Sequence, residues 1–454
     1  MPTRLPVRVV QDPSHGFRLL PHLETRSPDL RVSFDVVSGD RIRARMSGPA
    51  LPTLRGGEHK ADLPVGAAEV RAAAARLCTR WKQVFVDHRS TDADGLPLPG
   101  RPLRPFASAA DLSGEPEREL RRAVAELARG GASLLYDVLL GGQNERVEIF
   151  RTYLAMMLAS EGLRIRFDSA ELHLPWPMLC LKPRHLPEPP AEASGAGGAA
   201  PDGGPVGAAT RTAPDLDALF ALFLGHRHQI EHTGDAYLRV RTPVPAAGPP
   251  VVSLNHDTFV GQKTLAPQVA AALRDGTEFT PREKYHDLVR DLAEPDFREQ
   301  LMYFWGHGQF EPNGAEPAQL VIRLTDQIPF DGGTVRELRA EHLRTGSFHP
   351  FVFLNACHAA AVSGPADSAA LSRALIEHGA QGVLGPQIEM PQAFAAEYAL
   401  AFVTRYLRGG TSATAGALAL DLARHFAARY RNPLGFAYAL HSGMDTHLPP
   451  DTEG

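Results

Sequence analysis

The fold is decided by residues 301–308, L-M-Y-F-W-G-H-G, in which five apolar residues lead into a histidine between two glycines. A short apolar run of this kind, bounded by glycine, is typical of a buried β-strand. A second such run, F-V-F-L-N-A-C, occupies residues 351–357. Because active residues of parallel α/β sheets gather at the carboxyl ends of the strands, we expect His307 and Cys357 to lie at one sheet edge.

Strand-like and helical segments alternate on both sides of these two runs. This alternation predicts an α/β fold with a mainly parallel sheet flanked by helices. The expected strands are 237–242, 251–255, 301–305, 351–356, 382–385 and part of 435–443, and the expected helices are 264–274, 283–299, 368–379, 391–408 and 412–430.

The N-terminal third has a different organisation. Residues 31–65 alternate in polarity around Ser38-Gly39-Asp40, which predicts a β-hairpin, and an alanine-rich stretch at about 64–87 predicts a helix that closes this small module. Two further amphipathic helices are expected within 116–165, followed by a strand. We divide the chain into an N-terminal segment (1–30), the hairpin-plus-helix module and linker (31–115), a lead-in (116–186), an insert (187–214), a catalytic core (215–445) and a tail (446–454).

The insert is defined by its composition. From 189 to 214, 19 of 26 residues are Ala, Gly or Pro. Such a segment holds too few large apolar groups to offset chain entropy, so we expect it to be flexible.

Composition and charge bear on the kind of partner and on the cellular compartment that we expect. The chain has 454 residues, a net charge of −5 and nearly balanced charge signs, which gives no electrostatic case for nucleic acid. The N-terminus lacks the apolar core of a signal peptide, and no later run reaches the roughly 18 apolar residues of a membrane-spanning helix. Three cysteines cannot form a disulfide framework, so we expect a cytoplasmic protein without a membrane span.

The two strand ends carry complementary chemistry. A thiol that attacks a carbonyl needs a positioned imidazole to manage protons, and His307 precedes Cys357 by 50 residues. The glycines beside His307 permit close backbone approach to a substrate and expose N–H groups for an oxyanion hole. Cys78 and Cys180 are interpreted as packed thiols.

At this point the chain resembles the CHAT proteins, a caspase-like cysteine peptidase family of the caspase and separase clan. The motifs that carry the resemblance are W-G-H-G-Q-F (305–310), L-T-D (324–326), F-L-N-A-C (353–357), A-L-I-E-H-G-A-Q-G-V-L-G (374–385), the upstream L-H-L-P-W-P-M-L (172–179) and the closing G-F-A-Y-A-L-H-S-G (435–443). The resemblance extends over about 116–445, and the 31–87 module is similar to the preface of longer members.

The resemblance implies a caspase-like sheet and assigns roles to individual residues. His307 takes the role of general acid/base and Cys357 that of the nucleophile, with the backbone N–H groups of Gly308 and Cys357 as oxyanion donors. No cofactor is needed. A protein substrate and a regulatory protein partner are implied, within bacterial stress, defence or cell-death circuits.

The chain departs from the family pattern in two places. After Cys357 it continues His-Ala-Ala where the family has a small residue and Gly, and after Gly385 it reads P-Q-I-E-M-P-Q, in which Glu389 is the one acid. If Glu389 lines the specificity pocket, it favours a basic P1 side chain. Asn355 shares a strand face with Cys357, so it either orients the site or makes a strand-end hydrogen bond.

Two alternatives remain open on the sequence. The altered residues after Cys357 and Gly385 are also compatible with a catalytically idle interaction scaffold. A zinc peptidase is a further alternative, because His228, Glu231 and His232 satisfy the H-x-x-E-H spacing that places two imidazoles on one helix face. We expect no metal site.

Overall fold

The computed structural model describes residues 27–37, 40–52, 58–91, 96, 98–182, 215–234, 248–313, 316–342, 348–356 and 370–448. Three predictions fall outside these residues: the 187–214 insert, the strand at 237–242 and the position of Cys357.

The two apolar runs form neighbouring parallel strands, as predicted. They are β8 (Leu301–Asn313) and β11 (Phe351–Ala356). On one side of this pair lie β6 (Val251–His256) and β7 (Glu278–Arg282), and on the other lies β12 (Gly382–Pro386). The order β7-β6-β8-β11-β12 is parallel throughout. The carboxyl ends of these strands therefore meet at one edge.

The sheet continues beyond β12 into the N-terminal region. β12 pairs antiparallel with β13 (Tyr438–His441), which is followed by β5 (Gln229–Thr233), β4 (Arg164–Asp168) and β1 (Leu30–Val37), all parallel to one another. Seven of the twelve pairings between described strands are parallel, which confirms a mainly parallel sheet.

The N-terminal module has one strand more than its hairpin predicted. β1, β2 (Arg41–Ser47) and β3 (His59–Gly66) form an antiparallel meander. Alternate residues of β2 are buried, so Ile42 and Met46 face the core and the arginines between them face outward. Because β1 also pairs with β4, the module is hydrogen-bonded into the central sheet.

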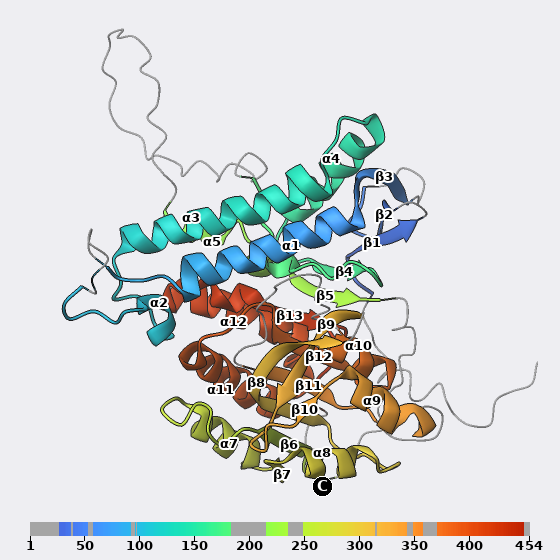
Figure 1. Ribbon diagram of the computed structural model, residues 1–454. Helices are drawn as coiled ribbons and strands as arrows, with labels where there is room; N and C mark the ends of the chain where they lie inside the picture. Colours follow the sequence, from blue (N-terminus) through green and yellow to red (C-terminus); the bar gives the residue numbers. More distant parts are fainter. Residues whose placement is uncertain are drawn as a thin grey trace, which may run out of the picture.

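Helices cover both faces of the sheet (Figure 1). Alternate residues of β8 enter two separate cores, with Tyr303 and Trp305 in one and Met302 and Phe304 in the other. The first core contains residues of α7 (Ala266–Arg274), α11 (Gln392–Arg408) and α12 (Ala415–Tyr430), and the second contains residues of α8 (Tyr285–Leu292), α9 (Gly332–Arg339) and α10 (Ala370–Glu377).

The N-terminal helices form on the predicted apolar stripes. They are α1 (Ala67–Trp81), which continues as a π-helical turn at Lys82–Val86, α3 (Glu117–Ser133) and α4 (Glu145–Ala159). Figure 1 shows α1 and α3 side by side. The remaining α-helices and β-strands are α2 (Pro105–Ser108), α5 (Leu216–Phe220), α6 (Leu224–Arg227), β9 (Glu316–Arg323) and β10 (Pro329–Phe330).

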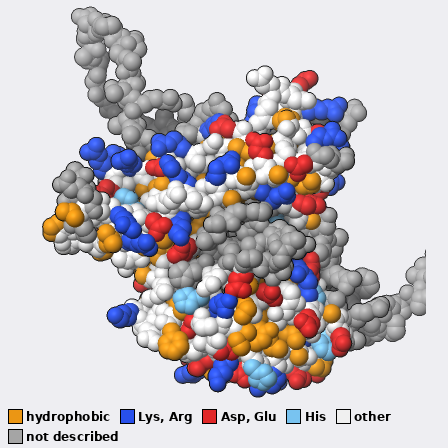
Figure 2. Space-filling view, in the orientation of Figure 1, with side chains coloured by type: hydrophobic (Ala, Val, Ile, Leu, Met, Phe, Trp, Pro, Cys, Tyr) orange, Lys and Arg blue, Asp and Glu red, His pale blue; other side chains and the backbone are white. Residues whose placement is uncertain are grey.

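The charged surface is mixed in sign. Figure 2 shows Lys and Arg side chains interspersed with Asp and Glu over the described parts of the face in view. Among the residues that the structure describes, no helix combines the length and the apolarity needed to cross a membrane.

Candidate active site

β8 changes partners at the histidine. Trp305 is paired with His256 of β6 and Gly306 with Ala356 of β11, whereas His307 is paired with Arg323 of β9 in an antiparallel hairpin. His307 therefore stands at the carboxyl edge of the parallel sheet, where the hairpin begins. Gly308 follows in the hairpin.

Glycine is required at position 306. A Cβ atom at this position would stand 2.5 Å from the carbonyl oxygen of Arg323, well inside the closest approach that Cβ atoms show. The clashing oxygen is a backbone atom that cannot rotate away, so the strand leading to His307 can come this close to β9 only without a side chain.

The register sets the residues that precede the two predicted catalytic positions side by side. Ala356, which precedes Cys357 in the chain, is paired with Gly306, which precedes His307. Neighbouring strands lie about 4.8 Å apart. Cys357 itself is outside the described residues. The pairing of Ala356 with Gly306 is therefore the observation that bears on its distance from His307.

A buried carboxylate faces the imidazole. Asp257 directly follows β6, and its Oδ2 lies 3.8 Å from Nε2 of His307. The Asp257 side chain is 1% exposed and that of His307 is 30% exposed. Asp257 Oδ1 accepts a hydrogen bond from the backbone N–H of Phe259 at 2.9 Å, and Oδ2 accepts one from Nε2 of Gln327 at 2.9 Å.

The loop that carries Asp257 is fixed on the strand that carries His307. The backbone N–H of Asp257 donates to the carbonyl of Trp305 at 2.8 Å, and the Trp305 indole N–H donates to the carbonyl of Val260 at 3.1 Å. Gly261 has φ +71° and lies against the indole, where a Cβ atom would stand 2.5 Å from the ring. Trp305 is thus a packing residue.

Sequence reasoning missed Asp257 and Gln327. The position of Asp257, two residues after the predicted strand 251–255, could have suggested it. Gln327 carried no signal, because it meets Asp257 only through the fold.

Two exposed apolar side chains follow Asp257 and Gln327 closely in the chain. Phe259 is 73% exposed and follows Asp257 by two residues, and Ile328 is 44% exposed and follows Gln327. Their nearness in the chain to the residues that face His307 makes them candidates for substrate contact.

Asn355 lies in the core rather than on a surface. It is 1% exposed, and its Nδ2 donates to the Tyr303 hydroxyl at 3.1 Å and to the carbonyl of Ala395 at 2.9 Å. The Tyr438 hydroxyl donates to Asn355 Oδ1 at 2.7 Å. This network uses the whole amide to join β11 to α11 and β13, which accounts for the residue structurally.

Glu389 lies in the loop after β12, at the same strand end as the other predicted site residues. Its carboxylate forms an ion pair of 2.5 Å with the ammonium of Lys82 from the end of the N-terminal helix. The two side chains are 20% and 30% exposed. The carboxylate that was predicted to select a basic P1 residue is therefore paired with a lysine of this chain.

The zinc alternative fails on its local structure. Residues 229–233 form strand β5 and not a helix, so His228 and His232 are about 13 Å apart along the chain. A ring nitrogen of His228 is hydrogen-bonded to the backbone carbonyl of Leu158, and a ring nitrogen of His232 is hydrogen-bonded to that of Ser169. Glu231 faces the other side and accepts from Arg166 at 2.7 Å. The spacing that joins two imidazoles on a helix separates them on a strand.

The two other cysteines are packed, as predicted. Cys78 and Cys180 are both buried. Burial raises the pKa of the Cys78 thiol to about 12 and that of Cys180 well above its usual value. Neither forms an appreciable thiolate near neutral pH, so they are unreactive in the folded chain.

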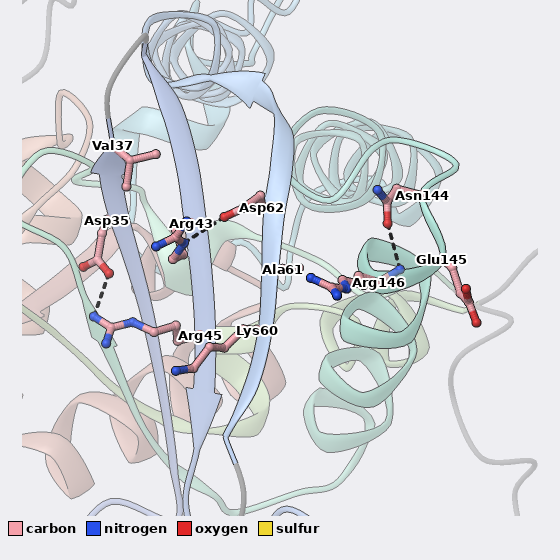
Figure 3. Close-up of a pocket in the computed structure, with 10 residues that line it drawn as sticks. All are labelled: Asp35, Val37, Arg43, Arg45, Lys60, Ala61, Asp62, Asn144, Glu145 and Arg146. Carbon is pink, nitrogen blue, oxygen red and sulfur yellow. Dashed lines mark hydrogen bonds and ion pairs between the residues drawn. The ribbon is translucent and has the colours of Figure 1, made fainter.

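A cavity of about 640 Å³ lies at the opposite end of the sheet (Figure 3). It is formed by the outward face of β1–β3 and the first residues of α4. Arg43 and Asp62 form an ion pair of 2.8 Å within it, and Arg45 and Asp35 form one of 2.6 Å. None of its lining residues is a Cys or His, so this cavity is not a second candidate for the acyl-transfer site.

Comparison with known families identifies the segment around His307. Residues 253–431 match the family model of the CHAT domain. This segment is similar to the CHAT domain family. The matched residues run from within β6 to the end of α12, and they include His307, Asp257 and Cys357. Strands β1–β5 and β13 extend its sheet beyond the matched residues.

Individual proteins are also similar to the chain. A probable protease of Vitiosangium sp. (strain GDMCC 1.1324) is 30% identical over 171 residues, which cover 37% of this chain and 20% of that protein. The chain thus spans about a fifth of the curated relative that it matches. Two crystal structures of the Saccharomyces cerevisiae separase–securin complex align with 10% identity, at TM-scores of 0.47 and 0.44. They cover 91% and 94% of this chain and 30% and 31% of the chain they match.

Proposed function

We propose that the chain is a caspase-like cysteine endopeptidase, with Cys357 as the nucleophile and His307 as the general acid/base. The observation that carries this proposal is the pairing of Gly306 with Ala356, because it sets the residues that precede His307 and Cys357 side by side at one sheet edge. The match of the same segment to the CHAT family supports it.

The chemistry is acyl transfer. The Cys357 thiol gives its proton to His307, and the thiolate sulfur forms a bond to the scissile carbonyl carbon while the carbonyl electron pair moves to oxygen. The backbone N–H groups of Gly308 and Cys357 are the proposed oxyanion donors. Collapse breaks the C–N bond, and His307 returns its proton to the leaving amine. Water then attacks the thioester, His307 takes its proton, and the thiolate leaves.

The substrate is a protein or peptide segment. The exposed side chains of Phe259 and Ile328, which follow Asp257 and Gln327 in the chain, are the proposed apolar contacts for a substrate side chain. Glu389 is the proposed acid of the P1 pocket, and a basic P1 residue would replace Lys82 on its carboxylate.

We also propose control by a protein partner, in a cytoplasmic bacterial stress, defence or cell-death pathway. The family resemblance supports this step. The N-terminal module offers a route for control, because Lys82 at the end of its helix contacts Glu389 in the loop after β12.

Labelling with a library of thiol-directed peptidyl electrophiles tests the proposal. The full chain is incubated with the library and the adduct is located by peptide mapping. We expect one adduct, on Cys357, which is lost in Cys357→Ala and strongly slowed in His307→Ala.

Cys78 and Cys180 are internal controls, since both thiols are buried. If the folded chain carries no adduct on Cys357 with any member of the library, the enzyme proposal fails and an idle scaffold is favoured.

A further inference from the structure

We propose that Asp257 is the positioning residue of this active site: its carboxylate holds the imidazole of His307 with the Nε2 proton toward Asp257, which leaves Nδ1 to exchange a proton with the Cys357 thiol. This inference rests on the proposed function. Asp257 does not touch the reacting atoms and acts through His307.

The burial of the carboxylate carries the argument. Asp257 is 1% exposed, and the two hydrogen bonds it accepts, from the Phe259 N–H and the Gln327 amide, come from neutral donors. A buried carboxylate is costly unless a cation or several donors compensate its charge. Within the described ranges, His307 is the cationic partner that the structure places within 4 Å of it.

The separation suits a site without substrate. At 3.8 Å, Nε2 and Oδ2 are beyond the length of a direct hydrogen bond but close enough for strong charge attraction. Catalytic hydrogen bonds are often long in free enzymes and shorten in the reacting complex. Formation of the imidazolium strengthens the attraction at the step that needs it.

The carboxylate is held from two sides. Its own backbone is bonded to Trp305, two residues before His307. Gln327 adopts the left-handed conformation (φ 59°), and its amide donates both to Asp257 and to the carbonyl of Leu324. Asp257 is therefore fixed to β8 and to the loop after β9, the two elements that border the imidazole.

Other charged groups near the imidazole have partners of their own. Arg323 of β9 is paired with His307 of β8. Its guanidinium binds Glu311 and the carbonyl of Gln327. His256 at the end of β6 lies 3.9 Å from Glu283. Among the described groups, Asp257 is thus the carboxylate that faces His307 directly.

The consequence is a more basic imidazole and a more acidic thiol. A carboxylate within about 4–6 Å favours the charged form of an imidazole and so raises its pKa. The imidazolium in turn stabilises the thiolate, so the thiol should ionise below its ordinary pKa of about 8.5.

The rate of alkylation by iodoacetamide, measured from pH 5 to 10, tests this without any substrate. Asp257→Asn keeps the shape of the side chain and removes its charge. We expect the pH midpoint of Cys357 alkylation to rise by about one unit or more in this variant, and further in His307→Ala. Asp257→Glu, which restores the charge, should return the midpoint toward that of the wild type. Asp275→Asn is the matched control, because Asp275 is an exposed surface acid, and should leave the midpoint unchanged.

The outcomes separate the two proposals. If the wild type and His307→Ala have the same midpoint, there is no thiol–imidazole pair and the proposed function itself fails. If His307→Ala shifts the midpoint but Asp257→Asn does not, the pair stands and the role of Asp257 is wrong. Equal shifts in Asp257→Asn and Asp257→Glu would also refute it, because the charge would then be irrelevant.

A second measurement needs no change at Asp257. In Cys357→Ala, NMR titration of the His307 ring should give a midpoint above the ordinary value of about 6.5, with the neutral ring protonated at Nε2. A midpoint at or below 6.5, or a neutral ring protonated at Nδ1, would overturn the proposal. Alkylation of Cys78 or Cys180 identifies any variant that has lost its fold. In that case the NMR titration of His307 decides whether Asp257 has the proposed role.

Discussion

Gly306→Ala tests whether the close approach of β8 and β9 sets the position of His307. The added Cβ atom would stand 2.5 Å from the Arg323 carbonyl oxygen, and real Cβ atoms do not come within 3.0 Å. The strands must therefore separate by about 0.5 Å or more, and neither atom belongs to a side chain that can rotate away. Overpacking of this kind costs about 1–3 kcal/mol of unfolding free energy.

The same displacement should act on reactivity, because the next residue is His307. A misplacement of about 1 Å costs on the order of 100-fold in a catalysed rate, so half of that should slow Cys357 labelling by about tenfold. Urea unfolding measures the first effect, in a Cys357→Ala background, and the rate of labelling by a peptidyl electrophile measures the second.

Gly114→Ala is the matched control for this substitution. No atom lies within 4 Å of a Cβ placed at position 114, and its φ is not in the left-handed region. We expect the control to stay within about 0.5 kcal/mol of the wild type. If Gly306→Ala is equally stable and labels at the wild-type rate, the hairpin does not constrain His307 and the reasoning is wrong.

Three further predictions follow from the described contacts. Asn355→Ala should lower the unfolding free energy by roughly 3–6 kcal/mol, because it breaks three buried hydrogen bonds; a loss below about 1 kcal/mol in urea would show that the network is not structural. Burial lowers the pKa of His232 to about 3 and that of His441 to about 4, so the unfolded chain binds more protons below pH 6.5. The unfolding free energy should therefore fall between about pH 6.5 and 4, by up to about 1.4 kcal/mol per pH unit for each histidine, and the decline should be shallower in His441→Gln. Lys82→Met should increase cleavage after Arg several-fold relative to cleavage after Leu, since it releases the Glu389 carboxylate; an unchanged preference would remove Glu389 from the P1 pocket.

The strands and helices that the sequence predicted are those with strong apolar patterns. The runs at 301–305 and 351–356 became adjacent buried strands because nearly all their side chains are apolar and fit a sheet covered on both faces. The helix at 283–299 is shorter than predicted and ends at Leu292. β7 was missed because Pro281 argues against a strand, and the structure accommodates it at the edge of the sheet, where β7 pairs only with β6 among the described strands.

β5 was missed because its side chains are polar. Glu231 and His232 are buried; Glu231 is paired with Arg166, and one ring nitrogen of His232 is hydrogen-bonded to the carbonyl of Ser169, both far away in the sequence. Asp257 was also missed because its partners lie far away in the sequence. Its importance depends on the pairing of β6 with β8, which a local pattern does not specify.

The cleavage profile of a peptide library by the full chain, compared with that of Cys357→Ala, tests the central claim most directly. The new termini are identified by mass spectrometry. We predict cleavage products with the wild-type chain, their loss in Cys357→Ala and their near loss in His307→Ala. A profile that is the same in the wild type and in Cys357→Ala would contradict the account, because Cys357 would then not be the nucleophile.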